Sequence, residues 1–327
     1  MSPLASAEAE TQHASSLAVI VPCYNEEAVI AATHERLLAA LAPVDIHLEL
    51  IYVDDGSRDT TLELLNQIQA KSDVTTILAL SRNFGHQAAV TAGIEYVDAD
   101  VVVIIDADLQ DPPEVIPQML AKWEEGYSVV YGRRMSREGE TRFKRHSASL
   151  FYKVLSRMSE VEIPHDTGDF RLMDRRIVDV LKEMPEQHRF LRGMVSWVGF
   201  DQVAVEYDRH ARLGGETKYS LKKMISLAFD GVFSFSYQPL RMAIWVGVAT
   251  ASIATLGIIY ALAMRLFSDH WVSGWTFIVV SMLFIGGIQL LFLGVIGEYV
   301  ARIYAESKSR PLFVYKQIKT SQKKRNE

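Results

Sequence analysis

Residues 101–114 have the sequence VVVIIDADLQDPPE, and this stretch decides the fold. Five consecutive β-branched aliphatic side chains are typical of a strand that is buried on both faces of a sheet. The strand leads directly into three acids, Asp106, Asp108 and Asp111. Like charges this close together are unfavourable unless something compensates them. These carboxylates should therefore hold something, and the rest of the chain should show what it is.

Short apolar runs alternate with amphipathic segments up to about residue 135. Strand-like runs lie at 17–22, 47–55, 75–81 and 100–108, and segments with helical spacing lie between them at 27–42, 60–72 and 86–97. This β-α-β-α order predicts an α/β fold, with a mostly parallel, Rossmann-like sheet and helices on both faces. In open sheets of this kind, ligands bind beyond the carboxyl ends of the strands.

Polar residues follow each of the four predicted strands. They are Tyr24 to Glu26, Asp54 to Ser57, Ser81 to Asn83, and Asp106 with Asp108. Any one of these groups could be an ordinary turn or helix cap. Four groups at one edge of the sheet favour a binding cleft instead.

Asp106 and Asp108 are separated by one residue at the end of a strand, so their side chains should point in the same general direction. The pair requires either one protonated carboxyl or a cation between the two. Asp and Gln oxygens suit Mg²⁺ or Mn²⁺. The sequence has no His/Cys cluster with zinc spacing, and its nine histidines are scattered and expected at the surface or in the core. A divalent cation here could bridge a diphosphate and neutralise a departing nucleotide.

Two long apolar segments, 242–267 and 275–300, occupy the C-terminal third. Their uncharged cores, 243–264 and 275–297, are just over twenty residues each. At a rise of about 1.5 Å per residue, each core spans a hydrocarbon layer of about 30 Å. Helices in soluble cores rarely stay apolar on all sides for this length, so a transmembrane hairpin of two spans is favoured over two buried helices.

The charges around this hairpin predict its orientation. The connection at 268–274, SDHWVSG, has no Lys or Arg, whereas Lys222, Lys223 and Arg241 precede the hairpin and eight Lys and Arg residues follow it. The positive-inside rule then places both termini in the cytoplasm, at the inner membrane. Polar residues at intervals of four oppose an apolar face in 221–239. This pattern favours an interfacial amphipathic helix, with packing of that face on the soluble domain as the alternative.

Composition excludes some other classes of protein. The net charge of −6 argues against a nucleic-acid partner, because no basic excess is present to neutralise phosphates. Cys23 is the only cysteine, so no intrachain disulfide can form. The predicted organisation is a disordered tail (1–16) in place of a signal peptide, a cytoplasmic catalytic domain (17–219), the interfacial helix (220–239), the hairpin (240–300) and a basic cytoplasmic tail (301–327).

Several motifs together resemble the family 2 glycosyltransferases, which have a GT-A fold. They are VIVPCYNEE (19–27), VDDGSRDT (53–60), LSRNFGHQAAVTAG (80–93) and DADLQDPPE (106–114). TGDFRLMDR (167–175), FLRG (190–193), RLGGETKYS (212–220) and the paired spans narrow the resemblance. They resemble the membrane-anchored polyisoprenyl-phosphate glycosyltransferases, the group of bactoprenol glucosyltransferase and dolichol-phosphate mannose synthase.

The resemblance implies a donor site at the edge of the sheet. The nucleoside pocket would consist of Pro22, Tyr24, Glu26 and Asp55, with Arg82 near the diphosphate and Asp106 and Asp108 holding the nucleotide sugar and the metal. Asp55 would accept a hydrogen bond from the imide N–H of uracil, as a carboxylate can. Gln110 would be a further contact to the metal or the sugar. For Tyr24 and Gln110, core packing and an ordinary turn remain the alternatives.

The resemblance also implies an acceptor site. Arg133, Arg142 and Arg145 belong to a basic segment that is either a solvated loop or a grip on the acceptor phosphate, and Arg212 and Lys218 are similar candidates. Asp169 matches the residue proposed in the family as catalytic base. A phosphate monoester has a second pKa of about 6, so at neutral pH it has little proton for a base to remove. Asp169 is therefore as well suited to orienting the acceptor as to taking a proton.

These features predict an inverting transfer of a sugar from a UDP-sugar, with UDP-glucose as the first choice, to undecaprenyl or another polyprenyl phosphate. The product would serve cell-envelope glycan modification, and the resemblance implies a homo-oligomer. Alternative donors are a UDP-aminoarabinose derivative, GDP-mannose, UDP-galactose and UDP-N-acetylhexosamines. A processive polysaccharide synthase is a less favoured alternative, because such an enzyme normally needs a Q-x-x-R-W motif and more than two spans. A non-enzymatic binding module is disfavoured as well, because it would not need the Asp106 and Asp108 pair.

Overall fold

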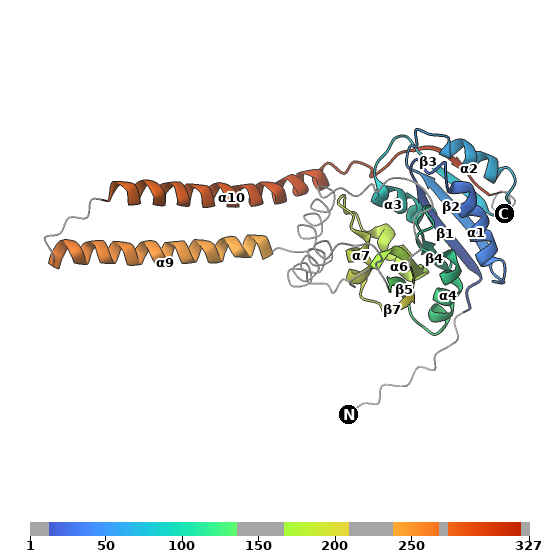
Figure 1. The fold of residues 1–327 in the computed structure, drawn as a ribbon, viewed down its shortest axis with the longest axis horizontal. Coiled ribbons are helices and arrows are strands. Elements are labelled where there is room, and N and C mark those ends of the chain that lie inside the picture. The colour runs from blue at the N-terminus through green and yellow to red at the C-terminus, as the bar shows by residue number, and fades with distance from the viewer. Residues whose placement is uncertain (1–12, 136–166, 209–237, 268–273, 322–327) are drawn as a thin grey trace, which may run out of the picture.

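The structure is a computed structural model that describes residues 13–135, 167–208, 238–267 and 274–321. Among these residues, eight strands form one sheet in the order β7-β5-β6-β4-β1-β2-β3-β8 (Figure 1). The strands are β1 (Ser16–Cys23), β2 (His47–Asp54), β3 (Thr75–Leu80), β4 (Val101–Ile104), β5 (Val129–Arg134), β6 (Thr167–Asp174), β7 (Gln202–Tyr207) and β8 (Tyr315–Lys319).

Helices cover both faces of this sheet. They are α1 (Ile30–Leu41), α2 (Thr61–Gln69), α3 (His86–Tyr96), the 3₁₀ helix η1 (Pro113–Val115), α4 (Ile116–Glu124), α6 (Arg175–Glu183) and α7 (Leu191–Val198). Alternate side chains of β1 enter opposite cores: Val19 packs with α1 and α4, whereas Ile20 packs with α3 and α6. The prediction of an α/β fold with a sheet covered on both faces is confirmed.

The central strands β4, β1, β2 and β3 are all parallel, as their continuous apolar runs predict. β6 lies between β4 and β5 and is antiparallel to both. Its register pairs Ile104 with Arg171, which brings the first residues of β6 to the edge where β4 ends. Antiparallel β6 therefore adds side chains to the edge that was predicted to bind ligands.

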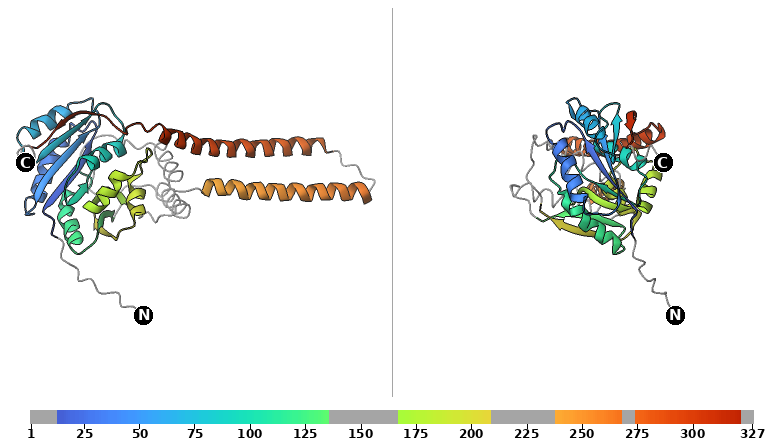
Figure 2. Two further views of the ribbon diagram at one scale, coloured as in Figure 1. Left: turned by 180° about the vertical axis from the view of Figure 1, so that it is seen from behind. Right: turned by 90° about the vertical axis from the view of Figure 1, so that its right-hand side faces the viewer.

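Two long helices, α9 (Gln238–Phe267) and α10 (Trp275–Ser307), extend side by side away from the domain (Figures 1 and 2). Large apolar side chains cover their surface, and Trp245 and Phe277 are 73% and 76% exposed. Within the described residues, two stretches are long and apolar enough to cross a membrane, Leu240–Gly257 and Val280–Ser307. This finding rests on length and composition, and it agrees with the two spans predicted from the sequence.

The segment after α10 returns to the domain and adds β8 to the edge of the sheet, antiparallel to β3. Figure 1 shows it crossing the domain beside α3 and β3. The sequence of this region predicts only a basic tail and no strand.

Several predicted features lie outside the described residues. They are most of the N-terminal tail, nearly all of the interfacial helix at 220–239, and the acceptor candidates Arg142, Arg145, Arg212 and Lys218.

Candidate functional site

The turn after β4 carries the first two acids of the opening stretch. β4 ends at Ile104, four residues earlier than predicted, so Asp106 and Asp108 lie in a turn and not in the strand. Leu109 within this turn has a positive φ of 57°, a conformation that leucine rarely adopts and that costs about 1 kcal/mol or more. The Asp108 Oδ1 atom accepts a hydrogen bond from the Gln110 backbone N–H at 3.1 Å. The surrounding fold thus holds an otherwise unfavourable turn at the edge of the sheet.

The two carboxylates differ in their exposure. The Asp106 side chain is 36% exposed, whereas Asp108 is buried, with 7% of the whole residue exposed. Asp106 is therefore the one that an incoming ligand can reach most easily.

Asp169, near the start of β6, lies in a cluster of polar side chains from three other parts of the chain. Arg192 Nε donates to Asp169 Oδ1 at 2.7 Å, and His86 Nε2 lies 3.0 Å from Oδ2. Gln87 Nε2 also donates to Oδ2, at 3.3 Å. His86 Nε2 is in addition 3.8 Å from Asp106 Oδ1. We refer to His86, Gln87, Asp106, Asp169 and Arg192 as the Asp169 cluster.

The charges in this cluster are strongly coupled. Burial alone raises the pKa of Asp169, but the Arg192 guanidinium and the His86 imidazole outweigh burial and hold that pKa well below its usual range. Burial lowers the pKa of His86, yet Asp169 and Asp106 raise it to about 9, so the imidazole is protonated at neutral pH. A carboxylate with such a depressed pKa is a poor general base, because the best base has a pKa near the operating pH.

Asp106 has the opposite perturbation. Partial burial raises the pKa of Asp106 to about 6, and the neighbouring carboxylates Asp169, Asp111 and Asp108 add to this effect while His86 opposes it. An excess of negative charge that disfavours a carboxylate also favours a bound cation. The turn after β4 is thus electrostatically suited to a metal ion.

The described residues also show what kind of metal site is available. None of them form a group of three or more His, Cys, Asp or Glu side chains that could hold an ion. Mg²⁺ is commonly bound by one or two carboxylates together with substrate phosphates, and not by a complete protein cage. Asp106 and Asp108, with Gln110 beside them, would suit a cation of that kind, and the oxygens of a bound diphosphate would supply further ligands.

The third acid of the opening stretch, Asp111, has a different environment. It is 1% exposed and contacts the Tyr207 hydroxyl, and Arg134 Nη2 lies 3.4 Å from its Oδ1. This network ties the turn after β4 to β5 and β7. Arg133, the predicted acceptor contact on β5, is exposed and lies 3.7 Å from Glu206.

Asp55, predicted to read uracil, is buried after β2 and supports the loop after β3. Its two carboxylate oxygens accept the backbone N–H groups of Phe84 and Gly85 at 2.7 and 2.9 Å. Gly56 has a φ of 65°, and a Cβ atom there would lie 2.4 Å from the Arg82 carbonyl carbon. Only glycine allows these two loops to approach so closely.

The remaining donor candidates lie on the same edge. Pro22 is buried at the end of β1, and Tyr24 and Glu26 follow it half-buried. The exposed Arg82 places its guanidinium 4.0 Å from the centre of the Phe84 ring. The structure therefore brings all of the predicted donor residues to the ends of β1 to β4 or to the loops that follow them, and their roles in binding stay predictions.

Asp55→Ala should destabilise the domain, because it leaves the buried N–H groups of Phe84 and Gly85 without their acceptor. We expect the free energy of unfolding to fall by about 1–3 kcal/mol. Chemical denaturation of the purified protein measures this change. Asp73→Ala, at an exposed aspartate before β3, is the matched control. Equal stability of the two variants would contradict the proposed support of the loop.

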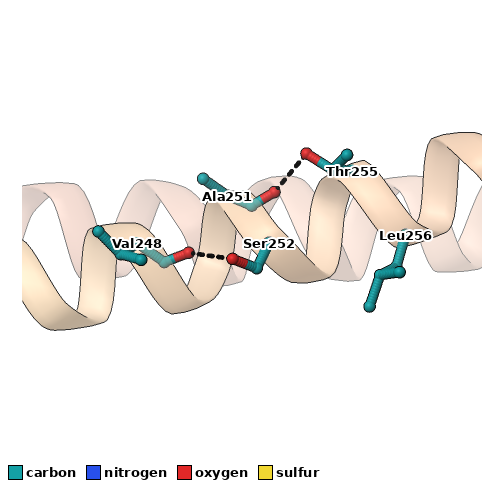
Figure 3. A pocket seen from close by; sticks show the side chains of 5 residues that line it. All are labelled: Val248, Ala251, Ser252, Thr255 and Leu256. Carbon is teal, nitrogen blue, oxygen red and sulfur yellow. Dashed lines mark hydrogen bonds between the residues drawn. The ribbon is translucent and has the colours of Figure 1, made fainter.

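A shallow hollow on α9 is not part of this site. It is lined by Val248, Ala251, Ser252, Thr255 and Leu256 (Figure 3). The Ser252 and Thr255 hydroxyls donate to carbonyls of the preceding turn of their own helix, at 2.8 Å each. The hollow thus has an apolar surface whose hydroxyls are already paired.

Three members of the Asp169 cluster were not predicted as site residues: His86, Gln87 and Arg192. His86 was expected among surface or core histidines, and it is instead an ion-pair partner of Asp169. The sequence does contain a signal, because the motifs LSRNFGHQ and FLRG include these residues, but neither motif alone indicates a role for them. Their contact with Asp169 could not be predicted, because these residues are far from Asp169 in the sequence.

Comparison with known proteins identifies the family of this chain. The sequence profile of Glycosyl transferase family 2 matches residues 18–181. A Bacillus subtilis protein described as the uncharacterized glycosyltransferase YkcC is 49% identical over 90% of this chain and 92% of its own length. A prophage bactoprenol glucosyl transferase homolog of Escherichia coli is 37% identical over 93% of this chain and 99% of its own length. Bactoprenol glucosyl transferase of Shigella phage SfV is 38% identical over 93% of this chain and 99% of its own length.

Solved structures are more distant. One of them is glucosyl-3-phosphoglycerate synthase from Mycobacterium tuberculosis in complex with Mn²⁺, UDP and glucosyl-3-phosphoglycerate. The similarity covers 67% of this chain and 78% of the synthase chain, with 18% sequence identity and a TM-score of 0.43. This similarity is too low to transfer the role of any residue.

Proposed function

Because this chain belongs to glycosyl transferase family 2, we propose that it transfers a sugar from a nucleoside-diphosphate donor to a polyprenyl phosphate. The observation that carries the proposal is the Asp169 cluster, in which His86 contacts both Asp106, in the turn after β4, and Asp169. The full-length similarity to bactoprenol glucosyl transferases, which includes the two apolar helices, supports the lipid acceptor. UDP-glucose and undecaprenyl phosphate are our first choices.

On the donor side, Asp106, Asp108 and Gln110 would hold Mg²⁺ or Mn²⁺ together with the diphosphate. The bound cation would neutralise charge that builds up on the leaving nucleotide. Tyr24, Glu26 and Asp55 lie on the loops beside this turn, where the nucleoside would bind.

On the acceptor side, a single displacement accounts for the chemistry. An oxygen of the lipid phosphate forms a bond to the anomeric carbon, the bond from that carbon to the donor diphosphate breaks, and the nucleoside diphosphate leaves with the electron pair. The acceptor needs no base, because its second pKa of about 6 leaves it mostly dianionic at neutral pH. Asp169, kept ionised by Arg192 and His86, would orient the acceptor. Arg133, Arg142, Arg145, Arg212 and Lys218 are proposed to attract its phosphate.

The hairpin of α9 and α10 would anchor the catalytic domain to the inner membrane. The distribution of Lys and Arg supports a cytoplasmic position of this domain and of both termini. The product would then form on the cytoplasmic leaflet, where a membrane-anchored domain can reach the lipid headgroup. Self-association through the hairpin is a further part of this proposal.

A transfer assay tests the proposal. Purified protein is mixed with undecaprenyl phosphate and a panel of labelled UDP- and GDP-sugars, with Mg²⁺, Mn²⁺ or EDTA. We expect label in the lipid fraction with one donor, and EDTA should reduce the rate by a factor of about 10² or more, as expected when a metal stabilises the leaving group. Absence of lipid-linked sugar with every donor would refute the proposed reaction, and a rate unaffected by EDTA would refute the metal.

A further inference from the structure

The chain between α10 and β8 lies against the domain in a way that the proposed reaction does not explain. We define residues 306–315, from the last turn of α10 to the first residue of β8, as the C-terminal brace. It begins in the last turn of the second apolar helix and ends at the edge of the sheet (Figure 1). Its contacts fall into two groups, which reach two different segments that contribute to the Asp169 cluster.

The first group holds the connection that leads to Arg192. Gln187 lies between α6 and α7, five residues before Arg192. Its backbone N–H donates to Glu306 Oε1 at 2.8 Å, and its side-chain Nε2 donates to the Arg310 carbonyl at 2.8 Å. The end of α10 is thus fastened to the segment from which α7 and Arg192 begin.

The second group holds the segment that carries His86 and Gln87. The Val314 carbonyl accepts from the Ser81 N–H at 2.8 Å, where the chain leaves β3, and the Tyr315 hydroxyl donates to the Ala92 carbonyl in α3 at 2.9 Å. The Phe313 side chain is 8% exposed and packs in the same core as α3. The brace therefore contacts the chain on both sides of the loop that precedes His86.

The two segments that the brace contacts each place side chains on Asp169. His86 and Gln87 hold one of its oxygens and Arg192 holds the other. Gln87 also joins the two sides directly, because its Oε1 accepts from the Leu191 N–H at 3.2 Å. The hydrogen bonds of the brace described above do not involve Asp169 itself, so any effect on this carboxylate must pass through the other members of the cluster.

We propose that the C-terminal brace is a positioning element for the transfer site, and that it couples the placement of Asp169 to the end of the second apolar helix. The kinetic part of this inference rests on the proposed function, whereas the structural part does not. The far end of the brace is firmly held, because β8 pairs with β3 and the Ser321 N–H donates to the Thr76 hydroxyl at 3.1 Å. The competing explanation is that the segment only covers the open edge of the sheet.

The test compares the full-length protein with a Glu306→Ala, Tyr315→Phe double variant, which loses one bond of each group and keeps the Tyr315 ring. Tyr315→Phe alone serves if the double variant does not fold. The matched control is Gln317→Ala, at an exposed position of β8. Three quantities are measured: kcat for transfer, the Kd for UDP, and amide hydrogen exchange in peptides covering 84–92 and 185–195.

We expect kcat of the double variant to fall by about tenfold, since small misplacements of reacting groups cost one to two orders of magnitude. The Kd for UDP should stay unchanged, exchange should be faster in both peptides, and Gln317→Ala should match the wild type. Unchanged kcat and exchange would overturn the inference. A weaker Kd for UDP in step with the lower kcat would also overturn it, because that pattern indicates general loosening of the sheet edge.

The structural readout separates this inference from the proposed reaction. If the wild type transfers no sugar to any lipid, the proposed function fails, and hydrogen exchange alone decides the inference. Faster exchange in both peptides then supports the coupling, and unchanged exchange refutes it.

Discussion

Asp169→Asn is expected to lower kcat for sugar transfer by a factor of about 10³, in the range found when an electrostatic group of an active site is removed. The substitution keeps the size of the side chain but removes the charge that pairs with Arg192 and His86. The two cations would then lack their counter-charge and the acceptor phosphate would be drawn toward them, away from the line of attack. Steady-state transfer of labelled sugar measures kcat, and calorimetry measures the Kd for UDP.

The Kd for UDP should be nearly unchanged in Asp169→Asn, because the donor is held by the turn after β4 and the loops after β1 to β3. Asp179→Asn, at a half-exposed ion pair on α6, is the control and should keep full activity. Full activity of Asp169→Asn would remove this residue from the mechanism. A loss of UDP affinity equal to the loss of kcat would show that Asp169 acts on the donor.

Asp108→Ala is expected to lower kcat by a factor of about 10²–10³, because it removes a predicted ligand of the metal that stabilises the leaving diphosphate. It should also remove the difference between UDP binding with Mg²⁺ and UDP binding with EDTA. Titration calorimetry under both conditions measures that difference directly, without any need for the acceptor.

Asp108→Asn distinguishes loss of the metal ligand from damage to the turn. An asparagine oxygen can still accept the Gln110 N–H, as Asp108 Oδ1 does. We therefore expect the asparagine variant to fold like the wild type and yet bind UDP with little dependence on metal. If Asp108→Asn keeps full metal dependence while Asp108→Ala loses it, Asp108 supports the turn and is not a ligand.

The first half of the fold could be predicted because its strands are buried on both faces. Four apolar runs and the three amphipathic segments between them each correspond to an element whose ends lie within a few residues of the prediction. β6 and β8 could not be predicted in the same way. β6 joins the sheet through contacts with β4 and β5, which are distant in sequence, and β8 has exposed polar residues that resemble a solvated tail.

The positions of the candidate site residues could be predicted where these residues follow strand ends, but not where they depend on long-range contacts. Asp106 and Asp108 follow an apolar strand, so their place at the edge of the sheet was evident. Nothing in the sequence links His86 to Asp169, which is 83 residues away, or to Arg192 on a different helix. The left-handed turn at Leu109 is also unexpected, because leucine disfavours that conformation and the fold imposes it.

The proposed mechanism requires Asp106 and Asp108 to hold the donor diphosphate through a divalent cation. Anomalous scattering from crystals of the protein soaked with UDP and Mn²⁺ tests this claim most directly. We predict one manganese peak between these two carboxylates and the diphosphate, with the nucleoside over the loops that follow β1 and β2. A nucleotide bound with its manganese away from Asp106 and Asp108, or at the other edge of the sheet, would contradict the account.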